Sequence, residues 1–82
     1  MATPIQTRII ETLYIHTYFD ARHTSTKNAT KGIKKDQQDK ADKELKELRK
    51  QGIIIFHPTS HGMQVSLNSE QLREIKKILN IP

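Results

Sequence analysis

Cysteine is absent from the 82 residues, so the chain has neither a disulfide framework nor a thiolate-based zinc site. It also has no run of about 18 consecutive apolar residues, the length that a membrane-spanning helix requires. The first residues, MATPIQTR, lack the apolar stretch of a secretory signal. We therefore expect a cytoplasmic protein that does not enter the membrane.

Tryptophan is absent too, and only two tyrosines and two phenylalanines are present. Hydrophobic residues make up 34% of the chain, so each helix can bring only a narrow apolar stripe to one small core. The length predicts a single domain over residues 1–82. Because a second copy would add buried area, we expect a homodimer formed through the N-terminal helix, the C-terminal helix or both.

Motifs for catalysis or phosphate binding are also missing, because Gly32 and Gly62 belong to neither G-x-G-x-x-G nor G-K-[ST]. A core of this size leaves little room for a catalytic pocket. We therefore expect no enzyme activity and no cofactor. Of the four histidines, His57 and His61 could approach each other across a hairpin, but nothing else converges on them, and we expect no metal site.

The N-terminal segment predicts a helix from Thr3–Pro4, a capping hydroxyl followed by proline, to about Phe19. We interpret this helix as scaffold, and His16 as a hydrogen-bonded core or interface histidine. Its apolar stripe and the positions that widen it are Ile5, Ile9, Ile10, Leu13, Ile15, His16, Tyr18 and Phe19.

Positive charge gathers in the middle of the chain, which has a formal net charge of +5. A basic face attracts polyanions through phosphate contacts and counterion release, although a solvated lysine-rich surface is the simpler alternative. The same segment predicts a short helix, capped by Thr24 or Ser25, that runs to about Lys31 and is ended by Gly32. The segment from residue 22 to residue 35 contains no acid and five bases: Arg22, Lys27, Lys31, Lys34 and Lys35.

A third helix is predicted within residues 33–52, with a narrow apolar stripe of Ala41, Leu45 and Leu48. At its start, Gln37 and Gln38 could read adenine in a major groove or simply be solvated. The face opposite the stripe is mixed in sign, with acids Asp36 and Asp39 beside Lys40, Lys43, Lys46 and Lys50.

Gly52 is expected to end this helix, and the β-branched and aromatic run at 53–56 predicts a strand. A turn at 59–62 and a return strand at 63–67 complete a hairpin, with Pro58 at the far end of its first strand. In the return strand, alternation predicts Met63, Val65 and Leu67 inward and Gln64 and Ser66 outward.

Asn68 and Ser69 begin a C-terminal helix, with Gln71 as a possible capping partner of Asn68. This helix could pack on the first helix of its own chain or on that of a second copy. Its apolar stripe consists of Leu72, Ile75, Ile78 and Leu79. Together the elements predict an α+β winged helix: a three-helix core, a two-stranded β-hairpin wing and an extra C-terminal helix.

The stretch ELKELRKQGIIIFHPTSHGMQVSLN, with Leu-x-x-x-Gly ahead of the first hairpin strand, resembles the winged helix-turn-helix family of transcription regulators. It is most similar to the small single-domain winged-helix proteins of archaea and their viruses. The resemblance implies that the helix before Gly52 enters the major groove and that the wing contacts flanking backbone. The DNA-binding residues it implies are Gln37, Gln38, Lys40 and Lys43 on the helix, and His57, Ser60 and His61 on the wing.

Two functional classes follow. The favoured one is a DNA-binding transcriptional regulator, and the alternative is a winged-helix module that binds another protein without reading DNA. RNA binding is a weaker third option, because the aromatics form no visible stacking platform. Nucleic acid is favoured if one surface gathers Lys27, Lys31, Lys34, Lys43 and Lys46, and a protein partner if acids interrupt that surface.

Overall fold

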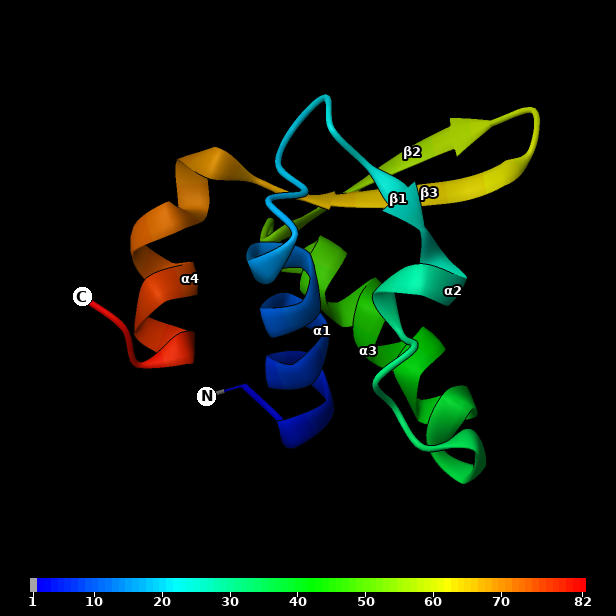
Figure 1. Cartoon of the computed structure of the whole chain (residues 1–82), viewed down its shortest axis with the longest axis horizontal. Coiled ribbons are helices and arrows are strands. Elements are labelled where there is room, and N and C mark those ends of the chain that lie inside the picture. The colour runs from blue at the N-terminus through cyan, green and yellow to red at the C-terminus, as the bar shows by residue number, and fades with distance from the viewer. Residues whose placement is uncertain (1) are drawn as a thin grey trace.

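A computed structural model describes residues 2–82 as an α+β fold of four α-helices and a three-stranded antiparallel sheet (Figure 1). The strand order is β1-β3-β2, so β3 is central. This arrangement is compatible with the expected winged helix. In chain order the elements are α1 Pro4–Ile15, β1 Thr24–Ser25, α2 Thr26–Ala29, the 3-10 turn Lys35–Gln37, α3 Gln38–Lys50, β2 Ile54–Thr59, β3 Gly62–Leu67, the 3-10 turn Ser69–Gln71 and α4 Leu72–Leu79.

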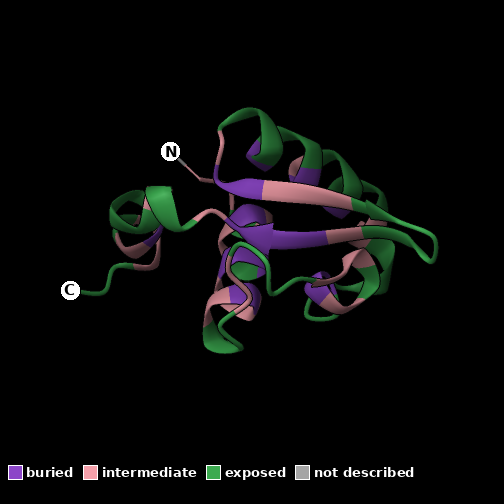
Figure 2. Cartoon of the chain, turned by 90° about the horizontal axis from the view of Figure 1, so that it is seen from above, coloured by how far each residue is buried: buried purple, intermediate pink, exposed green. Residues whose placement is uncertain are grey.

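One core joins all the layers. Buried side chains concentrate where the base of the hairpin meets α1 and α3, whereas the far end of the hairpin is exposed (Figure 2). The predicted stripe of α3 is confirmed, since Ala41, Leu45 and Leu48 are all buried. The other large contributors are Ile9, Ile10 and Leu13 of α1, Ile53 and Ile54, Val65 and Leu67 of β3, and Ile75 of α4.

The first helix ends four residues earlier than predicted. Thr17 takes a left-handed conformation (φ 56°), and the N–H of Tyr18 donates to the carbonyl of Leu13 at 2.9 Å. This is the hydrogen-bond pattern of a Schellman ending, which usually has glycine where Thr17 stands. Ile15 is therefore 65% exposed, and His16, at the helix end, is exposed rather than a core histidine.

After α1, residues 17–23 form a strap that runs along the edge of β3 before β1 (Figure 1), where Phe19 forms a parallel bridge with Leu67 and the N–H of Asp20 donates to the carbonyl of Leu67 at 2.9 Å. Tyr18 and Phe19 pack against the core from this strap, not from a helix. Ser66 points to the outward face as alternation predicted, but it is fully buried because its hydroxyl donates to the carbonyl of Asp20 at 2.8 Å. The strap covers the Ser66 side chain on that face.

The strap leads into a strand that the sequence did not predict. Thr24 pairs with Val65, and Ser25 pairs with Gln64. The Ser25 hydroxyl then caps α2 by accepting the N–H of Asn28 at 3.0 Å, as expected. The helix ends at Ala29, and Thr30 is its C-cap. Gly32 therefore does not terminate it as predicted.

Glycine has its predicted role at the end of α3. Gly52 has φ +77°, and the N–H of Ile53 donates to the carbonyl of Leu48 at 3.0 Å. The left-handed turn is accessible to glycine without steric penalty, and it turns the chain directly into β2.

The hairpin is longer than predicted, because only Ser60 and His61 lie between the strands. Pro58 pairs with Met63 inside β2, which is an edge strand and so tolerates a missing ladder donor. Val65 and Leu67 point inward as expected, whereas Met63, expected inward too, is 40% exposed. It lines an open groove together with Thr26, Asp42, Leu45 and Lys46, so it is only partly covered.

The C-terminal helix packs on α1 of the same chain, with Ile75 fully buried in that contact. Asn68 caps its start, but its side chain accepts the N–H of Glu70 at 3.0 Å. Gln71 contributes only its backbone N–H, to the carbonyl of Asn68, so its expected capping role was wrong. Within residues 2–82, no helix has both the length and the apolarity to cross a membrane.

Candidate nucleic-acid interface

The two sides of α3 have different environments. On one side the carboxylate of Glu44 accepts hydrogen bonds from the Thr3 hydroxyl and from the Gln6 amide, which ties α3 to the start of α1. On the other side the Arg49 guanidinium lies 5.1 Å from the centre of the Phe56 ring in β2. The side that faces the hairpin is therefore the one left open to a partner.

An open groove of about 290 Å³ lies on this second side. Leu45 and Phe56 form its apolar lining, and Lys46 stands at its edge. Asp42 also lines it, so the groove is not uniformly basic. Its lining residues come from α2, α3 and both hairpin strands: Thr26, Asp42, Leu45, Lys46, Phe56 and Met63.

The cations around the groove are free of carboxylate partners. Over residues 2–82, the one ion pair within 4.0 Å joins Arg8 and Glu11 on α1, at 3.4 Å. Lys46 and Arg49 are exposed, and Lys27 follows Thr26 on the exposed surface of α2. These side chains are thus available to a polyanion without first breaking an ion pair.

The outward face of α3 is mixed in sign, as the sequence predicted. At 100° per residue, Lys43 and Lys50 point away from the core, with Asp39 beside them. Lys40 projects on the side of Glu47 and does not reach the groove. All five side chains are exposed.

The two glutamines at the start of α3 differ. The Gln38 amide donates to the carbonyl of Ile33 at 2.8 Å and lies 3.4 Å from that of Thr30. It therefore holds the turn between α2 and α3 and would have to leave it to read a base. Gln37 is the N-cap residue of α3, and its side chain makes no capping hydrogen bond.

The predicted basic segment is divided by the fold. Lys31, Lys34 and Lys35 are exposed in the turn before α3, at the end of that helix distant from the hairpin (Figure 1). Arg22 lies on the strap, with its guanidinium 5.2 Å from the centre of the Tyr18 ring. Arg22 is not among the residues that line the groove.

The two histidines of the hairpin, His57 and His61, have different surroundings. The ring of His57 stacks on that of His23 at a centroid distance of 4.6 Å, on the strap side of the sheet. Ser60 and His61 form the exposed turn, where the His61 N–H donates to the Thr59 hydroxyl at 3.2 Å. His57 and His61 therefore do not converge, and the part of the chain that the structure describes has no group of three metal-ligating side chains.

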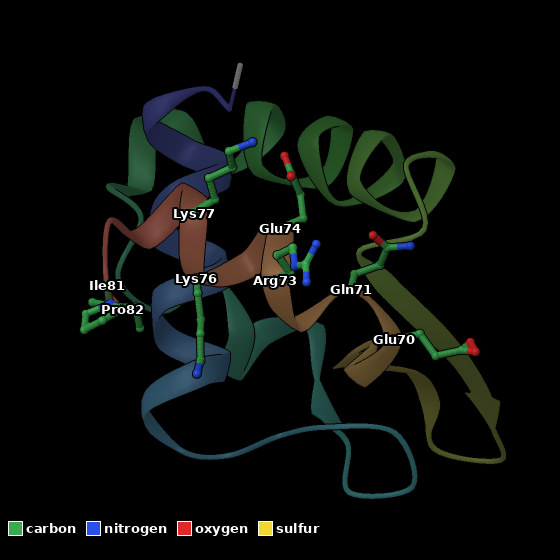
Figure 3. Close-up of a pocket in the computed structure, with 8 residues that line it drawn as sticks. All are labelled: Glu70, Gln71, Arg73, Glu74, Lys76, Lys77, Ile81 and Pro82. Carbon is green, nitrogen blue, oxygen red and sulfur yellow. The ribbon is translucent and has the colours of Figure 1, made fainter.

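Another hollow, of about 690 Å³, lies along α4 and the C-terminal residues. Figure 3 shows its side chains directed outward along the helix and not toward one point. Both signs of charge line it, with the acids Glu70 and Glu74 beside the bases Arg73, Lys76 and Lys77.

No protein-family model matches this chain, and neither a curated protein nor a solved structure matches it. Any functional assignment therefore depends on the geometry and chemistry of its own residues.

Sequence reasoning named only Lys46 as a binding residue among the residues that line the groove, and it did not name the neighbouring Arg49. Arg49 comes three residues after Lys46 and thus projects from the same side of α3, a signal that the helical period contained. Thr26 and Met63 carried no comparable signal. Their approach to Lys46 depends on how α2 and the hairpin pack around α3.

Proposed function

We propose that this protein binds duplex DNA as a winged helix, with α3 as the recognition helix and the β2–β3 hairpin as the wing. The observation that carries the proposal is the groove between them, which is lined by Lys46 and adjoined by Arg49 over the Phe56 ring, two exposed cations without carboxylate partners within 4.0 Å. Exposed cations that are not paired with carboxylates favour a polyanion over a small neutral ligand.

The topology supports the same proposal. The order α2, turn, α3, hairpin places a helix and a hairpin at the two sides of one groove, with β1 fixing the start of α2 to the sheet. In a winged helix these two elements contact neighbouring parts of one duplex. The proposal extends to a role in transcription regulation, because sequence-selective duplex binding is what such a surface offers.

The acids on α3 restrict how the helix meets DNA. Asp42 lines the groove and would repel a phosphate, but a carboxylate can accept the amino group of a cytosine in the major groove. Lys46 follows Asp42 by four residues and Arg49 follows Lys46 by three, so both cations project from the same side of α3 as Asp42 and would contact phosphates beside that base edge. The expected binding mode is therefore a shallow contact through one side of α3.

The proposed homodimer is supported by apolar surface on the opposite side of the molecule. A second groove of about 370 Å³ is lined by Tyr14, Phe19 and Leu72, where α1 and α4 meet. Leu72 and Ile81 are each 37% exposed, and Ile15 at the end of α1 is more exposed still. A cytoplasmic location, where genomic DNA is accessible, completes the proposal.

Salt-dependent titration tests this function. Affinity for a duplex of random sequence should fall linearly with salt on logarithmic axes, with a slope near −0.9 for each phosphate neutralised. Lys46→Ala should weaken binding and reduce that slope by about 0.9, whereas the matched control Lys77→Ala on α4 should leave both unchanged. Absence of duplex binding, or binding that does not depend on salt, would refute the proposal.

A protein-interaction module remains the alternative function, favoured by the acids Asp39 and Asp42 among the lysines and by the exposed apolar side chains of α1 and α4. The two functions differ in which surface matters. If the protein partners only through the α1–α4 side, Leu72→Glu abolishes its association and Lys46→Ala has no effect on any binding activity.

A further inference from the structure

Two apolar side chains stand together at the exposed end of the hairpin. Pro58 of β2 is the direct cross-strand partner of Met63 in β3, and every residue from 58 to 63 is exposed. Alternation along the strands puts both side chains on the face that also carries Phe56 and Val65, the face turned toward the helices. Met63 accordingly lines the groove together with Lys46 of α3.

Charge and apolar surface are separated on this side of the molecule. The hairpin end, PTSHGM, contains no lysine or arginine, so it offers a phosphate no permanently charged side chain. The nearest cations belong to α3, where Lys46 lines the groove and Arg49 lies over Phe56. The hairpin end therefore offers a bound duplex apolar side chains, beside the cations of α3.

We propose that Met63, supported by Pro58, acts as an apolar wedge that enters the minor groove of the bound duplex and partly unstacks one base step. The inference rests on the proposed duplex binding and adds how the uncharged wing contributes to it. Apolar side chains that enter the minor groove unstack base steps and bend the duplex toward the major groove. An unbranched thioether suits this role, because it adapts its shape without carrying a group that must be hydrogen-bonded.

Proline is a suitable neighbour for the same reasons. It has no N–H to leave unsatisfied against the apolar wall of the groove, and its ring is rigid. The tight turn of Ser60 and His61, closed by Gly62 at φ +112°, keeps the hairpin end narrow. The wedge therefore predicts a preference for steps that unstack easily, such as TA, over the stiff steps of an A-tract.

Two duplexes of identical composition test the wedge, one with a central TTAA and one with a central AATT, each carrying 2-aminopurine at the central step. The wild-type protein should bind the TTAA duplex more tightly and raise its 2-aminopurine fluorescence. Met63→Ser should weaken this binding by roughly tenfold, the factor that 1.4 kcal/mol represents, and should abolish the fluorescence rise. Its salt slope should equal that of the wild type, because no cation has been removed.

Matched variants separate the wedge from the electrostatic contact. Met63→Leu should retain the fluorescence rise, while Lys46→Ala should reduce the salt slope by about 0.9 and keep the rise at saturating protein. Thermal unfolding of each variant verifies folding, and since Met63 is exposed, Met63→Gln provides a second polar replacement if the serine variant unfolds.

The outcomes distinguish the two proposals. Salt-dependent binding by the wild type, together with unchanged affinity and fluorescence in Met63→Ser, overturns the wedge and leaves duplex binding intact. Failure of the wild type to bind any duplex overturns both. A wild-type complex without a fluorescence rise, or with equal affinity for TTAA and AATT, overturns the wedge alone.

Discussion

The imidazole rings of His23 and His57 stack with their centroids 4.6 Å apart and their planes inclined by 28°. His23 belongs to the strap and His57 to β2, so the stack fastens the strap to the sheet. The Ser66 hydroxyl donates its one hydrogen to the carbonyl of Asp20, and it must therefore accept the hydrogen bond from Nε2 of His57 at 2.8 Å. The buried Ser66 of β3 thus connects β2, through His57, with the strap, through Asp20.

His57→Ala should destabilise the fold by about 1 to 2 kcal/mol, because it removes the hydrogen bond to Ser66 and the ring stack. Urea unfolding monitored by circular dichroism measures the change. His61→Ala, in the exposed turn, is the matched control and should change the free energy of unfolding by less than about 0.5 kcal/mol. Equal effects of the two substitutions would show that the stack does not hold the strap.

The strap should also contribute a pH-dependent part of the stability. The hydroxyl and the backbone N–H of Ser69 lower the pKa of the Asp20 carboxyl from its ordinary value of 3.8. A carboxyl whose pKa is lower in the folded state stabilises the fold above its unfolded pKa, and this contribution is lost as pH falls through the folded value. Asp20→Asn should therefore reduce stability at neutral pH and flatten its decline below about pH 4.

Asparagine is the appropriate replacement here because Asp20 has φ 53°, a left-handed conformation that asparagine also tolerates. Urea unfolding at neutral pH and at about pH 3 compares the two proteins. If the variant and the wild type lose stability in parallel on acidification, the Asp20–Ser69 contact is not the source of the pH dependence.

Glu44 connects α3 to the N-terminus of α1, and its loss should leave a buried amide without a partner. Gln6 is only 3% exposed, and its amide donates to Glu44 at 3.1 Å. Glu44→Ala should cost about 1 to 3 kcal/mol of unfolding free energy. Glu47→Ala, on the exposed surface of the same helix, is the control. A double-mutant cycle with Gln6→Ala should recover a coupling of about 0.5 kcal/mol or more.

Two glycines allow a paired test of backbone conformation. Gly52→Ala should destabilise by roughly 1 to 2 kcal/mol, because a Cβ is unfavourable at φ +77° even though the site is open. Gly32 has no positive φ, and an added Cβ would meet only the flexible Arg8 side chain, at 2.7 Å from Nε. Gly32→Ala should consequently change the midpoint of thermal unfolding much less than Gly52→Ala, and the reverse order would contradict this account.

The division of the basic segment predicts unequal contributions to DNA affinity. Lys34→Ala combined with Lys35→Ala should leave folding unchanged and weaken binding equally across duplex sequences, as loss of phosphate contacts does. Arg22→Ala should have no effect on affinity, because Arg22 lies on the strap, away from the groove. Fluorescence anisotropy with two unrelated duplexes measures both changes. A strong effect of Arg22→Ala would place DNA on the opposite face of the sheet.

Several elements could be predicted because their signals are local. The stripe of Ala41, Leu45 and Leu48 follows from the helical period, and Gly52 supplies the left-handed residue that ends α3. The hairpin follows from a β-branched run, a turn and an alternating return strand. By contrast, the end of α1 escaped prediction because Thr17 carries a conformation that glycine usually marks.

The candidate site could be predicted only in part. Lys43 and Lys46 were recognised as exposed because the helical period alone determines which face of α3 is free. The Arg49–Phe56 contact, however, shows which side of α3 meets the hairpin. The hydrogen bond from the Gln38 amide to the carbonyl of Ile33 depends on the path of the turn before α3. Neither contact is encoded in the spacing of residues along one element.

The sequence by itself determined the α+β class, the positions of α3 and the hairpin, and the clustering of positive charge, because propensity, periodicity and charge are properties of neighbouring residues. Only the tertiary structure decided that the strap buries Ser66, that His57 pairs with His23, and that Met63 joins Lys46 at one groove. These contacts join residues far apart in the chain. They exist because burying the shared core brings α1, α3 and the sheet together in one arrangement.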